Sequence, residues 1–161
     1  EVYEKCYKDS PVYFNGKEYC GVKLDLGMDY GGPLFFTHYS FLGLDPRELN
    51  VDGFNLYDRN KAHSLIHYNY AIENPKGHRG LGAELWGFTS SDDPLVGYTS
   101  HHPGTDAENG TVSPTAAVSS IVYTPEESLG VIRHLYYDLG PKVFGKYGFY
   151  DAYAPGAREL F

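Results

Sequence analysis

A stretch of more than thirty residues, from Lys76 to Asn109, shows neither helical nor strand periodicity and is rich in Gly, Ser, Asp, His and Pro. It is too long to be a simple connection inside a compact domain, and loops of that length are usually functional or disordered. The apolar side chains within it argue against disorder: Leu85, Trp86, Phe88 and Tyr98. The chain must therefore fold its regular elements around a long, ordered loop.

Helical patterns precede this loop. Residues 33–42 begin with Pro33 and are apolar or aromatic on all sides, which predicts a buried helix that ends near Gly43 and Pro46. Residues 54–75 form the longest helical pattern, ended by Asn74-Pro75. The apolar residues of this second helix fall close to a helical repeat: Leu65, Ile66, Tyr68 and Ile72.

Helical patterns also follow the loop. Ser113 and Pro114 predict the start of a helix over 113–123. In 124–141, Thr124 and Glu127 predict a capping box. The stripe expected to be buried there is Leu129, Ile132, Leu135 and Leu139, before Gly140-Pro141 ends the helix.

A β-hairpin is predicted near the start, over residues 11–24, with Asn15-Gly16 as its two-residue turn. Together these patterns predict four or five helices, one small hairpin and little other sheet. The expected fold class is mainly α with long loops.

Composition disfavours several kinds of partner. The 161 residues suit one domain, and a net charge of −8 disfavours nucleic acid and anionic membrane surfaces. No apolar run approaches the roughly 20 residues needed to span a bilayer. The first residues, EVYEKCYKDS, do not resemble a signal peptide, so we expect a mature product or a fragment. Cys6 and Cys20 could form one disulfide in an oxidising compartment.

Two carboxylates stand beside aromatic residues. Glu84 lies two positions before Trp86, the one tryptophan, and Asp151 lies in GFYDAYAP. Hydrolysis of a glycosidic bond takes two carboxylates, and an aromatic wall can raise the pKa of an acid and stack on a sugar ring. The alternative at both positions is an ordinary surface acid. Asp92 and Asp93, which precede Pro94, are interpreted as turn caps.

Other chemistries receive less support. His63 and His67 are four residues apart on a predicted helix, but no third metal ligand is evident, so helix-surface or core-edge histidines are the favoured interpretation. His101-His102 is equally ambiguous. A GxSxG nucleophile elbow and a phosphate-binding loop are both lacking, which disfavours acyl transfer and nucleotide binding.

Several long motifs occur in one order: YGGPLFFTHYSFLGLDPR, DRNKAHSLIHYNYAIENP, GAELWGFTSSDDP, GYTSHHP, NGTVSPTAAVSSIVYTPEESLGVIRHLYYDLG and GFYDAYAP. Together they resemble the glycoamylase-like domain family, which includes bacterial endo-β-1,2-glucanases of glycoside hydrolase family 144. The similarity runs from about Tyr13 to Asp151.

The resemblance implies an (α/α)6 toroid around a sugar-binding cleft, and hydrolysis of β-linked glucan, such as β-1,2-glucan or a related oligosaccharide, with inversion and without metal or cofactor. By the same resemblance Asp151 would be the general base. Glu84 would be a second catalytic residue or would bind a sugar hydroxyl. The residues expected to bind substrate are Trp86, Tyr98, His102, His38, Tyr39 and Tyr150.

A complete toroid needs more chain than this. Residues 1–161 are expected to form a single but incomplete glycoamylase-like domain that lacks the early inner helices and the C-terminal helices. An isolated piece would expose inner surface and could self-associate. The alternatives are a non-catalytic carbohydrate-binding remnant and a helical module whose groove binds protein. Periplasmic or extracellular residence is implied by the resemblance alone.

Overall fold

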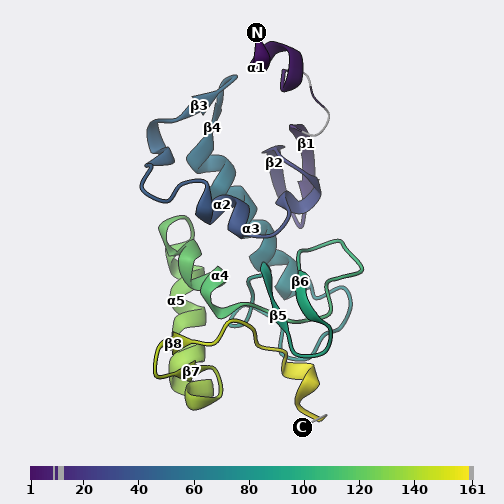
Figure 1. Cartoon of the computed structure of the whole chain (residues 1–161), viewed down its shortest axis with the longest axis vertical. Coiled ribbons are helices and arrows are strands. Elements are labelled where there is room, and N and C mark those ends of the chain that lie inside the picture. Colours follow the sequence, from purple (N-terminus) through teal and green to yellow (C-terminus); the bar gives the residue numbers. More distant parts are fainter. Residues whose placement is uncertain (9, 11–12, 160–161) are drawn as a thin grey trace.

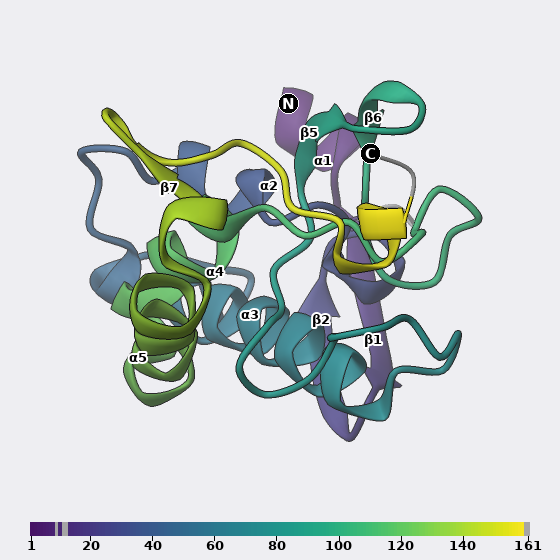
Figure 2. The same cartoon turned by 90° about the horizontal axis from the view of Figure 1, so that it is seen from below.

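The computed structural model describes residues 1–8, 10 and 13–159. A long helix, α3 (Leu56–Glu73), runs through the middle of an elongated molecule whose two termini lie at opposite ends (Figure 1). It lies between the β1–β2 hairpin on one side and helices α4 and α5 on the other (Figures 1 and 2). The other α-helices are short: α1 (Val2–Cys6), α2 (Phe35–Tyr39), α4 (Pro114–Ser119) and α5 (Pro125–Arg133).

The described residues form four antiparallel two-stranded sheets, where the sequence predicted one hairpin. These are β1 (Phe14–Tyr19) with β2 (Val22–Leu26), β3 (Asn50–Val51) with β4 (Phe54–Asn55), β5 (Ser90–Asp93) with β6 (Gly97–Ser100), and β7 (Phe144–Gly145) with β8 (Gly148–Phe149). The prediction of a mainly helical chain is confirmed. The extra sheets are short, and β5–β6 lies within the loop that shows no periodicity.

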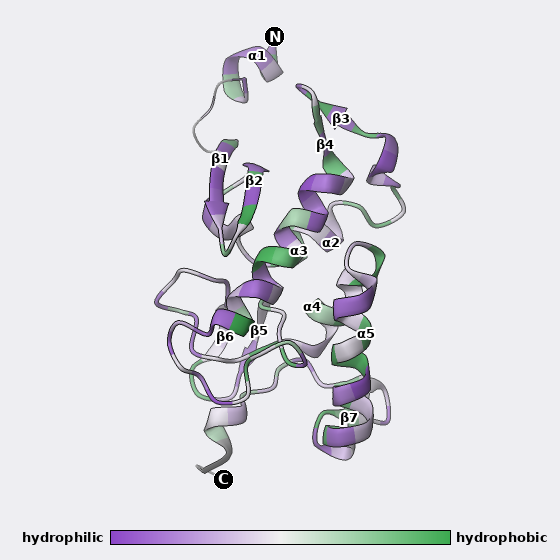
Figure 3. Cartoon of the chain, turned by 180° about the vertical axis from the view of Figure 1, so that it is seen from behind, coloured by the Kyte–Doolittle hydropathy of each residue, from purple (hydrophilic) through white to green (hydrophobic). Residues whose placement is uncertain are grey.

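The predicted hairpin exists, but its predicted turn is wrong. Cys20 and Gly21 form the turn, both at positive φ, and the pair Asn15-Gly16 lies inside β1 at a shift of register. Asn15 instead donates its side-chain amide to the carbonyl oxygen of Gly27 at 2.9 Å. Residues 11–12 of the prediction lie outside the described residues. Figure 3 shows that β1 is mostly hydrophilic.

Helix α3 ends at Asn74, as the sequence predicts, and begins at Leu56, inside the predicted segment. The Asn55 side chain caps it by accepting hydrogen bonds from the backbone of Tyr57 and Asp58, and Asn74 ends it in the left-handed conformation. The buried face is unexpectedly polar, because Ile72 is half exposed while the face turned inward includes Asn60, Ser64 and two histidines.

Those histidines, His63 and His67, are structural. Both rings donate from Nε2 to the carbonyl oxygen of Gly32, at 2.8 and 2.9 Å. The Nδ1 atom of His67 accepts from the backbone of Phe88, and burial lowers the pKa of His67 to about 3. With their nitrogens occupied in this way, the pair ties α3 to the turn before α2.

The hydrophobic core joins the loop to the helices. Trp86 and Phe88 are fully buried and pack in one cluster with Leu34, Val131 and Leu135. The backbone carbonyls of Gly87 and Phe88 bind the starts of two helices. The N–H of Leu34 donates to the carbonyl of Phe88 at 3.0 Å, and the N–H of Ser113 donates to that of Gly87 at 2.9 Å. The expectation that the loop is ordered around buried apolar residues is confirmed.

Two helices differ from their predicted packing. Helix α2 was expected to be buried on all sides, but within it only Thr37 is buried and Phe36 is exposed. In α5 the side chain of Thr124 makes no capping hydrogen bond, so the predicted capping box is absent. The buried positions of that segment are Ser128, Val131 and Leu135. The first two each lie one residue before the predicted Leu129 and Ile132, and Leu135 is buried as predicted.

Cys6 and Cys20 are both free thiols that form no disulfide. Among the described residues, none of the helices has the length and apolar character needed to cross a bilayer.

Candidate active site

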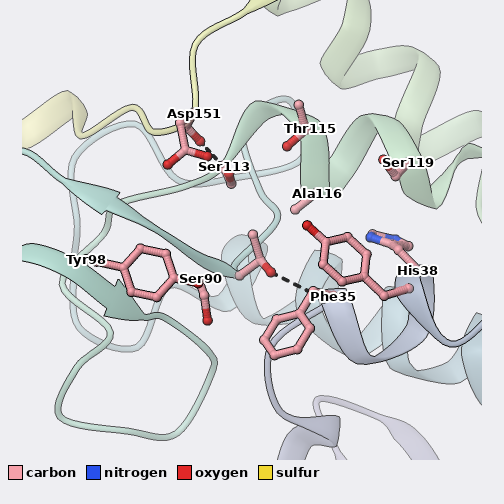
Figure 4. A pocket seen from close by; sticks show the side chains of 11 residues that line it. Phe35, His38, Ser90, Tyr98, Ser113, Thr115, Ala116, Ser119 and Asp151 are labelled. Carbon is pink, nitrogen blue, oxygen red and sulfur yellow. Dashed lines mark hydrogen bonds between the residues drawn. The ribbon is translucent and has the colours of Figure 1, made fainter.

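A cavity of about 380 Å³ brings together residues from distant parts of the sequence (Figure 4). It lies where α2, the β5–β6 hairpin, α4 and the segment after β8 meet. Hydroxyl groups, aromatic rings, one imidazole and one carboxylate line it. The lining residues are Phe35, His38, Tyr39, Thr89, Ser90, Tyr98, Ser113, Thr115, Ala116, Ser119 and Asp151.

Asp151 supplies the carboxylate, and its position is fixed from two sides. The backbone N–H of Asp92, on β5, donates to Oδ2 of Asp151 at 2.7 Å. The hydroxyl of Ser113, at the start of α4, donates to the backbone carbonyl of Asp151. Among the described residues, Oδ1 makes no hydrogen bond, so it can accept one from water or from a sugar hydroxyl.

The segment that carries Asp151 is held by a short ladder. Val112 and Tyr153 exchange two backbone hydrogen bonds, of 3.0 and 2.8 Å. This pairing explains why the Ser113 hydroxyl, which the sequence predicted as a helix cap, makes no cap and contacts Asp151 instead.

His38 lies on α2, at the opposite side of the cavity from Asp151 in Figure 4. Its Nε2 atom is 3.1 Å from the hydroxyl of Ser120, which itself donates to the carbonyl of Ala116. The imidazole therefore donates to Ser120. Burial lowers the pKa of His38 to about 4, so the ring is neutral near pH 7 and is not a charged acid there.

Two tyrosines are exposed at the cavity. Tyr98 on β6 is 75% exposed and Tyr39 on α2 is 70% exposed. Exposed tyrosines with both a flat face and a hydroxyl suit ligands that are partly apolar and partly polar. The cavity thus collects Asp151, Tyr98, His38 and Tyr39, four of the eight residues that the sequence and its family resemblance indicated.

Trp86, which the family resemblance indicated as a substrate-binding residue, does not line this cavity. The indole is fully buried and packs edge-on against Tyr68, with ring centroids 5.7 Å apart. A large apolar ring next to a tightly packed Gly87 gains more from the core than from a wet surface. Its role is to hold the loop in place.

Glu84, indicated as a second catalytic residue or a ligand of a sugar hydroxyl, does not line the cavity that Asp151 lines. Gly82 and Leu85 close a tight turn through two backbone hydrogen bonds of 3.1 Å. Leu85 points into the core at 2% exposure, which leaves Glu84 on the solvent side of the turn.

His102 and Tyr150 do not line the cavity either. His102 is half-buried in the loop after β6, with Nδ1 3.3 Å from the carbonyl oxygen of Pro103. Tyr150 lies against Gly145 of the β7–β8 hairpin, since a Cβ on Gly145 would come within 2.8 Å of its ring. Each is held by its own hairpin or loop.

Asp93 is a turn cap, as the sequence predicts. Its Oδ1 atom accepts from the backbone of Leu95 and Val96, at 2.7 and 3.1 Å. The structure adds that Asp93 is buried and that its second oxygen accepts from Asn109 and Thr111.

Sequence reasoning did not select several lining residues: Phe35, Thr89, Ser90, Ser113, Thr115 and Ser119. All of them lie inside motifs that carry the family resemblance. Small hydroxyl residues give no separate signal of function, because they are equally frequent in turns and helix caps. Among the described residues, there is no group of three or more His, Cys, Asp and Glu side chains that could hold a metal ion.

Comparison with known proteins shows which family the chain resembles. The model of the Glycoamylase family, described as "Putative glucoamylase", matches residues 1–159. An exo-β-1,2-glucooligosaccharide sophorohydrolase (non-reducing end) of Parabacteroides distasonis is 40% identical over 146 residues, which cover 91% of this chain and 20% of that protein. The chain thus spans about a fifth of the length of this curated relative.

Solved structures that are similar to this chain point to the same family. The endo-β-1,2-glucanase of Chitinophaga pinensis, in complex with sophorotriose and glucose, superposes with a TM-score of 0.89 at 42% identity, covering 96% of this chain and 38% of the other. A Bacteroides uniformis protein with the same description as the family gives a TM-score of 0.89 at 47% identity, with 96% and 37% coverage. This chain belongs to the Glycoamylase family.

Proposed function

We propose that this chain forms part of a glycoside hydrolase that acts on β-linked glucan, with β-1,2-glucan or its oligosaccharides as substrate. The observation that carries the proposal is the cavity in which one oriented carboxylate faces hydroxyls and exposed aromatic rings. Its volume of about 380 Å³ falls in the range of small-molecule sites. The similar structure with bound sophorotriose supports a glucan ligand.

In this proposal Asp151 is the general base of an inverting reaction. Its free Oδ1 would accept a proton from the attacking water, while Asp92 holds Oδ2 in place. An inverting pair needs a second carboxyl group roughly 6.5–9.5 Å away to protonate the leaving oxygen. Asp151 is the one acid that lines the cavity among the described residues, so a segment beyond these residues would supply that group and complete an (α/α)6 toroid.

The neutral His38, whose Nε2 donates to Ser120, would accept a hydrogen bond from a bound sugar at Nδ1 without carrying charge. Tyr39 and Tyr98 would offer their rings to the apolar faces of sugar units. Residence in the periplasm or outside the cell is part of the same proposal, and rests on the family resemblance.

Asp151→Asn tests the catalytic role. In the protein expressed from its complete coding sequence, this change is expected to lower the release of sugars from linear β-1,2-glucan at least about a hundredfold, as loss of a general base does. Asp92→Asn is the matched control, because Asp92 contributes its backbone N–H and not its side chain. Asp151→Asn turnover equal to wild type would remove Asp151 from the reaction.

A non-catalytic glucan-binding remnant is the second candidate, favoured by the presence of one carboxylate in the cavity. Calorimetry with β-1,2-glucooligosaccharides, run beside product analysis on the same sample, separates the two. Binding without cleavage by the protein from its complete coding sequence would establish the remnant, whereas cleavage would establish the enzyme.

A further inference from the structure

A second cavity, of about 250 Å³, is lined in part by Phe36 of α2 and by Ser40, and it shares none of the lining residues of the candidate active site. Its walls are mainly apolar side chains, and one charged side chain reaches it. The lining residues that matter here are Tyr13, Leu26, Phe36, Phe41, Leu56 and Arg59.

The guanidinium of Arg59 is anchored by neutral acceptors. Nε donates to the carbonyl oxygen of Leu26 at 3.2 Å, and Nη1 donates to Thr37 Oγ1 at 3.0 Å and to Asn60 Oδ1 at 3.3 Å. These contacts fix the plane of the guanidinium and involve Nε and Nη1.

The third nitrogen of the guanidinium, Nη2, is not used by these contacts. Among the described residues, Nη2 makes neither a hydrogen bond nor an ion pair. The fully buried polar atoms that lack a hydrogen bond do not include it, so Nη2 retains some exposure to solvent. It lies 2.7 Å from the position that a Cβ on Gly27 would occupy, and Gly27 lines the cavity. The donors of Nη2 are therefore available at the cavity wall.

A charge in this setting needs an anion. Buried or half-buried charges are stable in proteins when they are paired. Burial lowers the pKa of Arg59 to about 10, offset in part by the phenol oxygens of Tyr123 and Tyr13. Although the chain carries a net charge of −8, none of the ion pairs among the described residues includes Arg59.

We propose that this cavity binds a carboxylate attached to an apolar group: the carboxylate accepts from Nη2 of Arg59, and the apolar group packs against Phe36, Phe41 and Leu26. The carboxylate can belong to a small monocarboxylic acid or to an acidic side chain on another segment of the protein. A neutral sugar fits poorly, because the cavity has few polar groups besides Arg59 and its ligands. The inference is independent of the proposed glucan reaction.

Benzoate is the probe. Titrated into isotopically labelled protein and followed by NMR, it is expected to shift the guanidinium signals of Arg59 and the ring signals of Phe36 and Phe41 in a saturable way. Benzamide, which lacks the charge, and acetate, which lacks the apolar body, should each bind at least about tenfold more weakly, equivalent to about 1.4 kcal/mol.

Substitutions at the rim check the site without removing Arg59, whose other bonds support the fold. Ser40 is exposed and lines the cavity. Ser40→Glu places a negative charge there and should weaken benzoate binding at least about tenfold, while Ser40→Gln, of similar size, should leave it unchanged. Equal binding of benzoate and benzamide, no saturable shift at Arg59, or equal affinity in the two Ser40 variants would each overturn the proposal.

The source of the carboxylate is read from a second sample. If benzoate also binds the protein from its complete coding sequence, the natural ligand is a free acid. If benzoate binds residues 1–161 alone but not that protein, an acidic side chain of the remaining segment occupies the cavity. Binding to neither sample contradicts a carboxylate site altogether.

Discussion

At the scale of single residues, two near neighbours in sequence differ completely in their exposure to solvent. Trp86 is fully buried, whereas Glu84, two residues earlier, faces solvent. The sequence places both in one motif, and the family resemblance treats both as site residues. The tight turn at Gly82–Leu85 decides between them, because it directs Leu85 inward and leaves Glu84 outside.

Trp86→Ala is therefore expected to destabilise the fold, by about 3–5 kcal/mol. Tyr98→Ala removes a ring that is already 75% exposed and should change stability by less than about 0.5 kcal/mol while weakening glucan binding. Urea unfolding and calorimetry measure the two effects. A folded, stable Trp86→Ala protein that has lost glucan binding would restore Trp86 as a sugar ligand.

Three histidines give the fold a dependence on pH. Burial depresses the pKa of His38 to about 4 and of His67 to about 3, and that of His63 well below its ordinary value. The unfolded chain binds protons to these rings below about pH 6.5, where the folded chain does not. Their contribution to stability is thus full above pH 6.5 and is lost as pH falls toward the folded-state values.

The free energy of unfolding should accordingly decrease as pH falls from 6.5 to 4, by at most about 1.4 kcal/mol per pH unit for each of these histidines. Urea unfolding at a series of pH values measures this slope. His38→Gln should make the slope shallower. A stability that rises as pH falls through this range would show that these rings are protonated in the folded protein.

At the scale of elements, the end of α3 was predicted better than its buried face. Asn74 ends α3 because a left-handed residue acts locally, whereas the caps predicted at Ser113 and Thr124 make no capping hydrogen bond. The faces depend on what packs against them: α3 buries His63 and His67 because the carbonyl of Gly32 accepts from both rings, which no local pattern reveals. The turn at Cys20-Gly21 is a similar case, since Asn15-Gly16 offered the stronger local signal.

Two capping predictions can be compared directly. Asn55→Ala removes a cap that accepts two backbone hydrogen bonds and should cost about 1 kcal/mol. Glu127→Ala would cost a similar amount if the capping box existed; because Thr124 makes no capping bond, the expected change is below about 0.5 kcal/mol. Urea unfolding of both variants measures the two changes in stability. A loss of stability in Glu127→Ala equal to that in Asn55→Ala would contradict the structure at the start of α5.

At the scale of the whole molecule, the cavity assembles from α2, β5–β6, α4 and the segment after β8, which are far apart in sequence. Asp151, His38, Tyr39 and Tyr98 were predicted through the family motifs that hold them. Periodicity could not predict that they meet, because their meeting depends on backbone bonds such as Asp92 to Asp151 and Val112 to Tyr153. The small hydroxyl residues gave no signal at all.

Large apolar side chains remain exposed on residues 1–161, among them Leu42 at 77% and Val122 at 61%. We expect this chain alone to self-associate as its concentration rises, since exposed apolar patches favour association. Sedimentation velocity measures it, and Leu42→Ser with Val122→Ser should reduce the associated fraction. A chain that stays monomeric at high concentration would show that these residues do not form a cohesive surface.

The most direct test of the account is a crystal structure of the Asp151→Asn protein, from its complete coding sequence, with a β-1,2-glucooligosaccharide. The account predicts sugar in the cavity between Tyr39 and Tyr98, with the residue 151 side chain within hydrogen-bonding distance of the sugar or of a water beside the glycosidic bond. Sugar bound elsewhere, with this cavity occupied by solvent alone, would contradict it.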